Sequence, residues 1–194
     1  MPRASPDRDL SLVVTKYPDP AWTAIAAASV GEPSGDAREP DEHVLVSEGG
    51  APLLRLDVFY PEDEYRVRTE ADLWGEWVVV GFAARVVLFC PRDGRRREIA
   101  LSDVRPPDSL DYFCAIDSCE QALLVCSGRR VFRIGDDGEV LWKSGEVGLD
   151  GVFARVSCED GRVHGRGEWD PPGGWIDFTL SLATGEPVSV GSAT

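Results

Sequence analysis

The chain has 194 residues, of which 43% are hydrophobic, and a formal net charge of −14 at pH 7. This composition is typical of an ordered globular protein, and the length suits one all-β domain. The excess negative charge repels phosphate groups, so we expect neither nucleic acid nor an anionic membrane as a partner. No run of the sequence approaches the roughly 18 apolar residues of a membrane-spanning helix.

The first residues are mostly polar and predict a flexible N-terminus over residues 1–9, followed by a single all-β domain over residues 10–194. The start lacks the apolar core and the cleavage site of a signal peptide, so we expect a cytoplasmic protein. Leu10–Val14 then predicts a first strand.

Residues 20–30 have two interpretations. Asp19 before Pro20 is a good helix start, and the alanines that follow favour a helix. Alternating residues instead favour a strand, which is the interpretation we prefer: Trp22, Ala24 and Ala26.

The segment from Gly31 to Glu42 has no apolar period and predicts a solvated acidic loop. Its acidic side chains are candidates for binding a partner with a basic surface: Asp36, Glu39, Asp41 and Glu42.

A unit of three strands joined by turns occurs four times, at intervals of roughly 40 residues. The units begin near His43, Trp77, Ala122 and Arg162. In the second and third units, two apolar strands are followed by an Asp-Gly turn and a further strand, which is the pattern of consecutive hairpins.

Additional strands complete this pattern. Leu53–Tyr60 and Tyr65–Thr69 predict the second and third strands of the first unit, and Pro187–Val190 predicts the last strand of the fourth. Apolar runs at Tyr112–Ile116 and Val152–Val156 link the later units. One linking strand with three unit strands gives four strands per repeat, as in a propeller blade. The predicted fold is all-β with degenerate four-stranded repeats in a small or partial β-propeller-like arrangement, and a two-sheet β-sandwich is the alternative.

Residues 131–142 carry a family resemblance. A strand passes through Asp136-Asp137-Gly138 into a second strand that ends in Trp142, and this resembles the blade repeat of quinoprotein-type β-propellers. The resemblance implies a propeller-like fold. No residue of this chain matches the metal or quinone ligands of those enzymes, so their chemistry is not implied.

The segment from Gly165 to Trp175 combines aromatic, acidic and turn-forming residues. Pro171-Pro172 stiffens the chain and Gly173-Gly174 allows it to reverse. The turn has two interpretations: it binds a partner, or its tryptophans fold back on the edge of the core while Asp170 caps the turn. The candidate binding residues are Glu168, Trp169, Asp170 and Trp175.

No motif predicts catalysis, a metal site or a cofactor. The paired carboxylates lie on polar turns, where both members of a pair would be solvated, and neither histidine has a ligand at metal-binding spacing. The five cysteines lie mostly in apolar strands and predict buried free thiols in a reducing compartment.

These features predict a non-catalytic cytosolic module that binds a protein with a basic surface. One specific form is an acidic inhibitor or immunity-type protein, in which carboxylates take the place of phosphates. The alternatives are a carbohydrate-binding or glycan-acting β domain, which would use the tryptophan turn as a platform, and a structural subunit of a complex.

Overall fold

The computed structural model describes residues 9–33, 38–64, 66, 68–103 and 110–188. Within these ranges the protein has fifteen β-strands and one short 3-10 helix, Pro20–Trp22. The all-β prediction is confirmed.

The strands form four sheets, which we name A to D in chain order. Sheet A has the order β1-β3-β4-β2, with strands β1 Leu10–Thr15, β2 Ala27–Val30, β3 Glu42–Glu48 and β4 Ala51–Val58. Sheet B is an antiparallel meander of β5 Glu70–Trp74, β6 Trp77–Phe82, β7 Arg85–Phe89 and β8 Arg96–Ala100. Sheet C repeats this meander with β9 Phe113–Cys119, β10 Ala122–Ser127, β11 Val131–Ile134 and β12 Val140–Lys143. Sheet D has three strands, β13 Val152–Ser157, β14 Arg162–Glu168 and β15 Trp175–Ser181.

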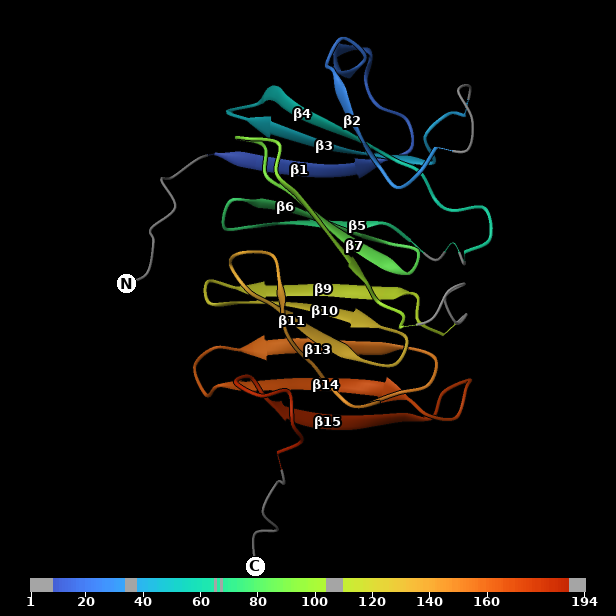
Figure 1. Ribbon diagram of the computed structural model, residues 1–194, viewed down its shortest axis with the longest axis vertical. Coiled ribbons are helices and arrows are strands. Elements are labelled where there is room, and N and C mark those ends of the chain that lie inside the picture. The colour runs from blue at the N-terminus through green and yellow to red at the C-terminus, as the bar shows by residue number, and fades with distance from the viewer. Residues whose placement is uncertain (1–8, 34–37, 65, 67, 104–109, 189–194) are drawn as a thin grey trace, which may run out of the picture.

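The sheets follow one another in a stack with sheets A and D at its ends (Figure 1). Successive side chains of a strand point to opposite faces. Leu123 and Leu124 are adjacent in β10 and both are fully buried, yet Leu123 packs in the cluster shared with sheet B and Leu124 in the cluster shared with sheet D. A third apolar cluster, which contains Phe82, fills the space between sheets A and B. Each internal sheet is therefore buried on both faces, and every residue of β6 and of β10 is buried.

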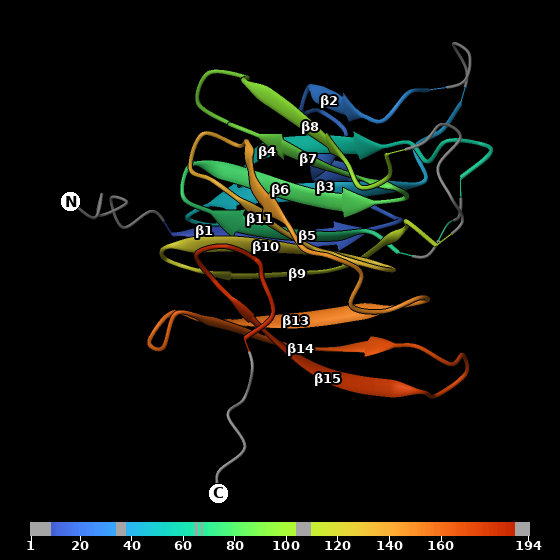
Figure 2. The same ribbon diagram turned by 60° about the horizontal axis from the view of Figure 1, so that its bottom comes forward.

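The first strand of every sheet lies along the same side of the stack. Strand β1 contacts β5, β5 contacts β9, and β9 contacts β13. This is the arrangement of a propeller, in which the innermost strand of each blade lies beside the innermost strand of the next. Sheet D ends the series, and the described chain places no further sheet beyond it (Figure 2).

Tryptophan side chains join successive sheets. The indole N–H of Trp74 donates to the carbonyl of Cys119 at 3.0 Å, and that of Trp77 donates to the carbonyl of Asp136 at 2.9 Å, so both join sheet B to sheet C. The indole of Trp142 extends from sheet C and donates to the carbonyl of Leu182 at 2.9 Å. These hydrogen bonds hold each of these sheets to the one that follows it and give each indole N–H an acceptor.

The repeat prediction is correct for sheets B and C and needs correction in the first unit. The expected strand at Tyr65–Thr69 does not form among its described residues, and Tyr65 and Val67 lie outside the described ranges. Instead β5 begins at Glu70 and belongs to sheet B, where it pairs with β6. The pattern of apolar residues did not show where sheet A ends and sheet B begins, because the segment between β4 and β5 is mostly polar and β5 itself begins with the polar Glu70.

Sheet A is completed by the N-terminal segment. Strand β1 pairs antiparallel with β3, and β2 pairs parallel with β4 at the outer edge. Both interpretations of residues 20–30 are partly correct. The Asp19 side chain accepts from the backbone N–H of Ala21 at 2.9 Å and begins the short 3-10 helix, and the strand follows only at Ala27.

The last strand expected in the fourth unit, Pro187–Val190, is described only in part. Pro187 forms an isolated antiparallel bridge with Leu180, and residues 189–190 lie outside the described ranges. The two-sheet sandwich is wrong, because the described strands form four separate sheets rather than two facing ones.

Candidate functional site

Sheet D has one face that packs on sheet C and one that does not. Val152, Ala154, Val163 and Leu180 belong to the buried cluster shared with sheet C. The alternate residues point the other way and are exposed or half-buried. We call this surface the open face; it consists of Phe153, Arg155, Ser157, Arg162, His164, Arg166, Glu168, Trp175, Asp177, Thr179 and Ser181.

An aromatic corner lies at one end of the open face. The rings of Phe153 and Trp175 have centroids 5.7 Å apart, and the Arg166 guanidinium lies 6.0 Å from the Trp175 centroid. Phe153 pairs with Arg166 across the strands, and Arg166 forms a 3.0 Å ion pair with Asp177 on β15. Phe153 is 47% exposed although it lies beside two other side chains. A partner that covers this corner would remove a large apolar ring from water.

A second row of the open face is polar. Arg155 pairs with His164, which pairs with Thr179. His164 Nδ1 lies 3.3 Å from the Thr179 hydroxyl, and its Nε2 lies 3.5 Å from an Asp160 carboxylate oxygen. A hydrogen bond from the Ser157 side chain holds the pKa of Asp160 below its ordinary value, and His164 acts in the same direction. Asp160 therefore carries its negative charge at neutral pH.

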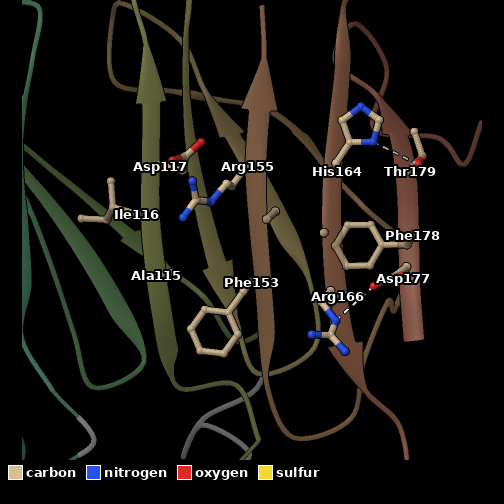
Figure 3. Close-up of a pocket in the computed structure, with 12 residues that line it drawn as sticks. Ala115, Ile116, Asp117, Phe153, Arg155, His164, Arg166, Asp177, Phe178 and Thr179 are labelled. Carbon is tan, nitrogen blue, oxygen red and sulfur yellow. Dashed lines mark hydrogen bonds and ion pairs between the residues drawn. The ribbon is translucent and has the colours of Figure 1, made fainter. Parts of the chain in front are cut away.

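A groove of about 710 Å³ lies between the open face and the innermost strand of sheet C. Ala115, Ile116 and Asp117 of β9 form one wall, and side chains of β13, β14 and β15 form the rest. Figure 3 shows Phe153 and Arg155 on the strand beside β9. The groove thus combines an aromatic ring, the arginines Arg155 and Arg166, and the carboxylates of Asp117 and Asp177.

The open face lacks the acidic excess of the whole chain. Three arginines, Arg155, Arg162 and Arg166, lie on it with two carboxylates, those of Glu168 and Asp177, which gives a local balance of 3 − 2 = +1. Asp160, which lies beside His164, brings this balance to zero. The whole chain carries −14, so this surface repels negatively charged groups less than the rest of the molecule does.

The tryptophan turn lies at the end of the hairpin that joins β14 and β15. The backbone N–H of Trp169 donates to the carbonyl of Gly174 at 2.9 Å, and the Glu168 carboxylate accepts from the backbone N–H of Gly173. The Pro171–Pro172 peptide bond is cis. Glu168, rather than Asp170 as the alternative interpretation expected, is the side chain that caps the turn.

Neither tryptophan of this turn belongs to the buried core. Trp169 is 37% exposed, and Trp175 lies half-buried against Phe153 on the open face. The Asp170 carboxylate is exposed. Of the two interpretations, closure of the core edge does not agree with these positions. The turn and the open face form one continuous surface through Trp175.

The predicted acidic loop is only partly a free surface. Asp41 accepts from Arg38 at 2.7 Å, from Arg66 at 3.0 Å and from the backbone N–H of Tyr60 at 2.9 Å. Glu42 is the half-buried first residue of β3. Glu39 is exposed, and Asp36 lies outside the described residues. The charge of Asp41 is therefore neutralised within the fold, which the sequence pattern did not indicate because Arg66 is distant in sequence.

The cysteine prediction is wrong for two of the five residues. Cys119 and Cys158 form a disulfide that joins sheets C and D, whereas Cys90, Cys114 and Cys126 are free and buried. Burial raises the pKa of the Cys114 thiol to about 11. Disulfides persist mainly in oxidising compartments, so this bond does not support the reducing compartment that five free thiols were expected to indicate.

A further group of titratable side chains lies on sheet A. His43 Nδ1 lies 2.8 Å from Asp57, which also forms a 3.0 Å ion pair with Arg55. Arg55 in turn donates to the carbonyl of Trp22 at 2.9 Å, so the cluster secures the N-terminal segment on sheet A. Within the described ranges, no three His, Cys, Asp or Glu side chains are grouped so that they could hold a metal ion. None of the described helices is long and apolar enough to cross a membrane.

The sequence did not indicate Phe153 or the cationic residues of the open face as site residues. Val152–Ser157 has the alternating pattern of a strand with one exposed face, and the exposed set contains Phe153 and Arg155. At the equivalent positions of the preceding repeat, strand β9 has Ala115 and Asp117. The change from a small and an acidic residue to an aromatic and a basic one distinguishes this surface from the buried face of sheet C.

The comparisons with known proteins support the fold. No protein-family model matches the chain, and no curated protein matches it by sequence. The crystal structure of BamB from Moraxella catarrhalis matches 75% of this chain and 44% of its own chain, with 13% identity and a TM-score of 0.52. The Mitotic Checkpoint Complex contains a chain matched with 11% identity over the same shares, at a TM-score of 0.49. The WD40 domain of SCAP from fission yeast matches 92% of this chain and 47% of its own, with 8% identity and a TM-score of 0.41.

The chain therefore spans less than half the length of the solved structures that it matches. At 13% identity, the likeness to BamB concerns the arrangement of the sheets and not the residues of a site. With four sheets stacked along their first strands, the described chain is a partial β-propeller-like protein built from blade repeats.

Proposed function

We propose that this chain is a non-catalytic protein-binding module whose contact surface is the open face of sheet D together with the tryptophan turn. The observation that carries the proposal is the exposed apolar group at this end of the stack. Phe153 is 47% exposed and Trp169 37%, and the ring of Trp175 lies beside that of Phe153. Aromatic and arginine side chains are the residues that most often dominate the binding energy of protein interfaces.

The surroundings of these residues support protein binding over carbohydrate binding. A sugar ring stacks on an open aromatic face, but Phe153 and the Arg166 guanidinium already lie beside the ring of Trp175. A protein partner instead uses the aromatic corner as an anchor and the polar rows as a rim that excludes water.

A second candidate function is the acidic inhibitor or immunity-type protein in the cytoplasm, and the net charge of −14 favours it. In this form a basic partner is attracted by the charge of the whole molecule, and Glu39, Asp170 and Glu168 belong to the contact. Asp41 and Glu42 contribute less, because the first is paired with arginines and the second is half-buried. The quinoprotein-type character of the repeats is likewise a proposal and rests on residues 131–142.

The test measures association and dissociation rates against purified candidate partners, beginning with the products of neighbouring genes. We expect Trp169→Ala and Phe153→Ala to raise the dissociation rate about tenfold or more and to leave the association rate nearly unchanged. Tyr17→Ala is the matched control, because Tyr17 is 81% exposed on the sheet A end of the molecule. Circular dichroism and a thermal melt establish that each variant folds.

Salt separates the two candidates. A basic partner attracted by the net charge associates more slowly as ionic strength rises, whereas a partner held by the aromatic corner loses little. If both aromatic variants keep the dissociation rate of the wild type and association slows strongly as salt is added, the binding site is the acidic surface and not the open face.

A further inference from the structure

Equivalent positions on the innermost strands can be identified from the hairpins that follow them. Trp74, Cys119 and Ser157 each form the last cross-strand pair before the turn, with Trp77, Ala122 and Arg162 respectively. Two residues earlier on the same face lie Asp72 in sheet B, Asp117 in sheet C and Arg155 in sheet D. These three residues point away from the preceding sheet.

At the junction of sheets B and C and at that of sheets C and D, the residue at this position is an aspartate that contacts the innermost strand of the following sheet. A carboxylate oxygen of Asp72 accepts from the Ser118 hydroxyl at 2.9 Å. A carboxylate oxygen of Asp117 accepts from the backbone N–H of Val156 at 2.7 Å. Ser118 and Val156 are themselves equivalent, because each lies one residue before the end of its strand hairpin. In sheets B and C, the aspartate at this position therefore binds the first strand of the following sheet.

Sheet D has an arginine where sheets B and C have aspartate. The side chain of Arg155 is exposed and forms no hydrogen bond or ion pair with any residue that the structure describes. In Figure 3 it lies beside Asp117, but no ion pair joins the two, and Asp117 already accepts from Val156. A guanidinium has only donors, so the group that matches it is an acceptor, and a carboxylate matches it best.

The neighbours of Arg155 favour the same kind of group. Arg162 and His164 lie on the same face of the adjacent strand. The carboxylates on or beside this face already have other partners: Asp177 pairs with Arg166 at 3.0 Å, Glu168 accepts from the backbone N–H of Gly173, and an Asp160 oxygen lies 3.5 Å from His164 Nε2. None of them occupies the guanidinium of Arg155, so an acidic segment that approaches this face can pair with it.

We propose that the open face binds an acidic β-strand of another polypeptide, in the place that the next sheet of the stack would occupy, with a carboxylate paired to Arg155. The inference rests on the proposed function of the open face and specifies its partner. The face is mostly polar and stable in water without a cover, so the complex forms and dissociates rather than being obligate.

The experiment uses three synthetic peptides of the same length that differ only in charge: (Glu-Thr)5, (Gln-Thr)5 and (Lys-Thr)5. Alternating threonine favours an extended conformation. We expect the immobilised full chain to bind (Glu-Thr)5 about tenfold more tightly than (Gln-Thr)5, although both the peptide and the protein carry net negative charge. Arg155→Ala should weaken the binding of (Glu-Thr)5 about tenfold, and Arg155→Glu should reverse the preference toward (Lys-Thr)5.

The matched control is Arg92→Ala, which removes the same charge from an exposed turn of sheet B. Equal binding of (Glu-Thr)5 by the wild type and Arg155→Ala would overturn the inference. If Phe153→Ala weakens peptide binding in that case, the proposed function stands and only the role of Arg155 fails. If neither variant changes binding, both fail.

Two further outcomes count against the inference. Tighter binding of (Lys-Thr)5 by the wild type would indicate that the net charge of the chain, and not the open face, selects the partner. A dimer in analytical ultracentrifugation that Arg155→Glu dissociates would identify the occupant as a second copy of this chain instead of a separate acidic polypeptide.

Discussion

The face of sheet C that meets sheet D and the open face of sheet D occupy equivalent places in the repeat but differ in chemistry. One row of sheet C consists of Ala115, Cys126 and Val131, and the equivalent row of sheet D consists of Phe153, Arg166 and Asp177. The row of sheet C is buried, whereas that of sheet D is exposed.

The next row repeats the contrast. Asp117 and Leu124 in sheet C correspond to Arg155 and His164 in sheet D. Leu124 is fully buried, and His164 is exposed. The same backbone framework therefore carries two kinds of surface: an apolar face that packs on the next sheet, and a polar face with an aromatic corner that no described sheet covers.

The largest effect that this comparison predicts is on stability. Leu124→Ala should lower the free energy of unfolding by about 3 kcal/mol, because it leaves a cavity between sheets C and D. Phe153→Ala on the open face should cost about 1 kcal/mol or less, since its ring is already half in water. Urea denaturation followed by tryptophan fluorescence measures both. Similar losses for the two variants would mean that the open face is part of the core.

The disulfide gives the next effect. Cys119 and Cys158 are 39 residues apart, so their bond restricts the unfolded chain, and Cys158→Ser should lower stability by about 2–4 kcal/mol. The bond joins sheet C to sheet D, whereas no described sheet is joined to the open face of sheet D. Thiol titration of the denatured, unreduced protein should find three reactive thiols, those of Cys90, Cys114 and Cys126. A count of five would contradict the pairing.

A smaller effect separates the two equivalent charged positions. Asp117→Ala removes the acceptor of the Val156 N–H and should cost about 1–2 kcal/mol. Arg155→Ala should change stability by less than about 0.5 kcal/mol, because its side chain has no partner among the described residues. Chemical denaturation of both variants checks the pair. A large loss for Arg155→Ala would show that the residue supports the fold rather than a partner.

The smallest effect at neutral pH concerns Tyr60, which packs between sheets A and B. Burial raises its pKa from 10.0 to about 12. The folded state then holds the phenol proton more tightly than the unfolded state, so this contribution to stability is present below pH 10 and is lost as pH rises toward 12. Thermal melts from pH 8 to 11 should show this decline, and Tyr60→Phe should reduce it. An unchanged slope in the variant would assign the decline to other groups.

The sequence predicted most of the fold correctly because the local signals were strong. Asp-Gly turns at Gly94 and Gly138 have the positive φ angles, 73° and 81°, that glycine adopts without strain. They separate β7 from β8 and β11 from β12. The first unit was less clear because sheet A combines strands from distant segments, and β2 reaches β4 by a parallel pairing that no hairpin signal marks.

The candidate site was predicted only in part. Trp169 and Trp175 were recognised from the unusual turn, and both lie at the uncovered end of the stack. The acids of the loop before β3 were selected on charge alone, and the position of Asp41 depends on Arg66, which is 25 residues away. Phe153 and Arg155 gave no local signal, since an exposed and a buried strand face have the same spacing.

The strands, most of the turns and the repeat could be predicted from the sequence, because these depend on side-chain alternation and on residues close together in the chain. Which faces meet became clear only in the folded structure. There Cys119 is paired with Cys158, Asp117 lies against the next sheet, and Arg155 has no following sheet to bind. Contacts between sheets join residues about 40 positions or more apart in the chain, and alternation along one strand does not identify the residue that its side chains will contact.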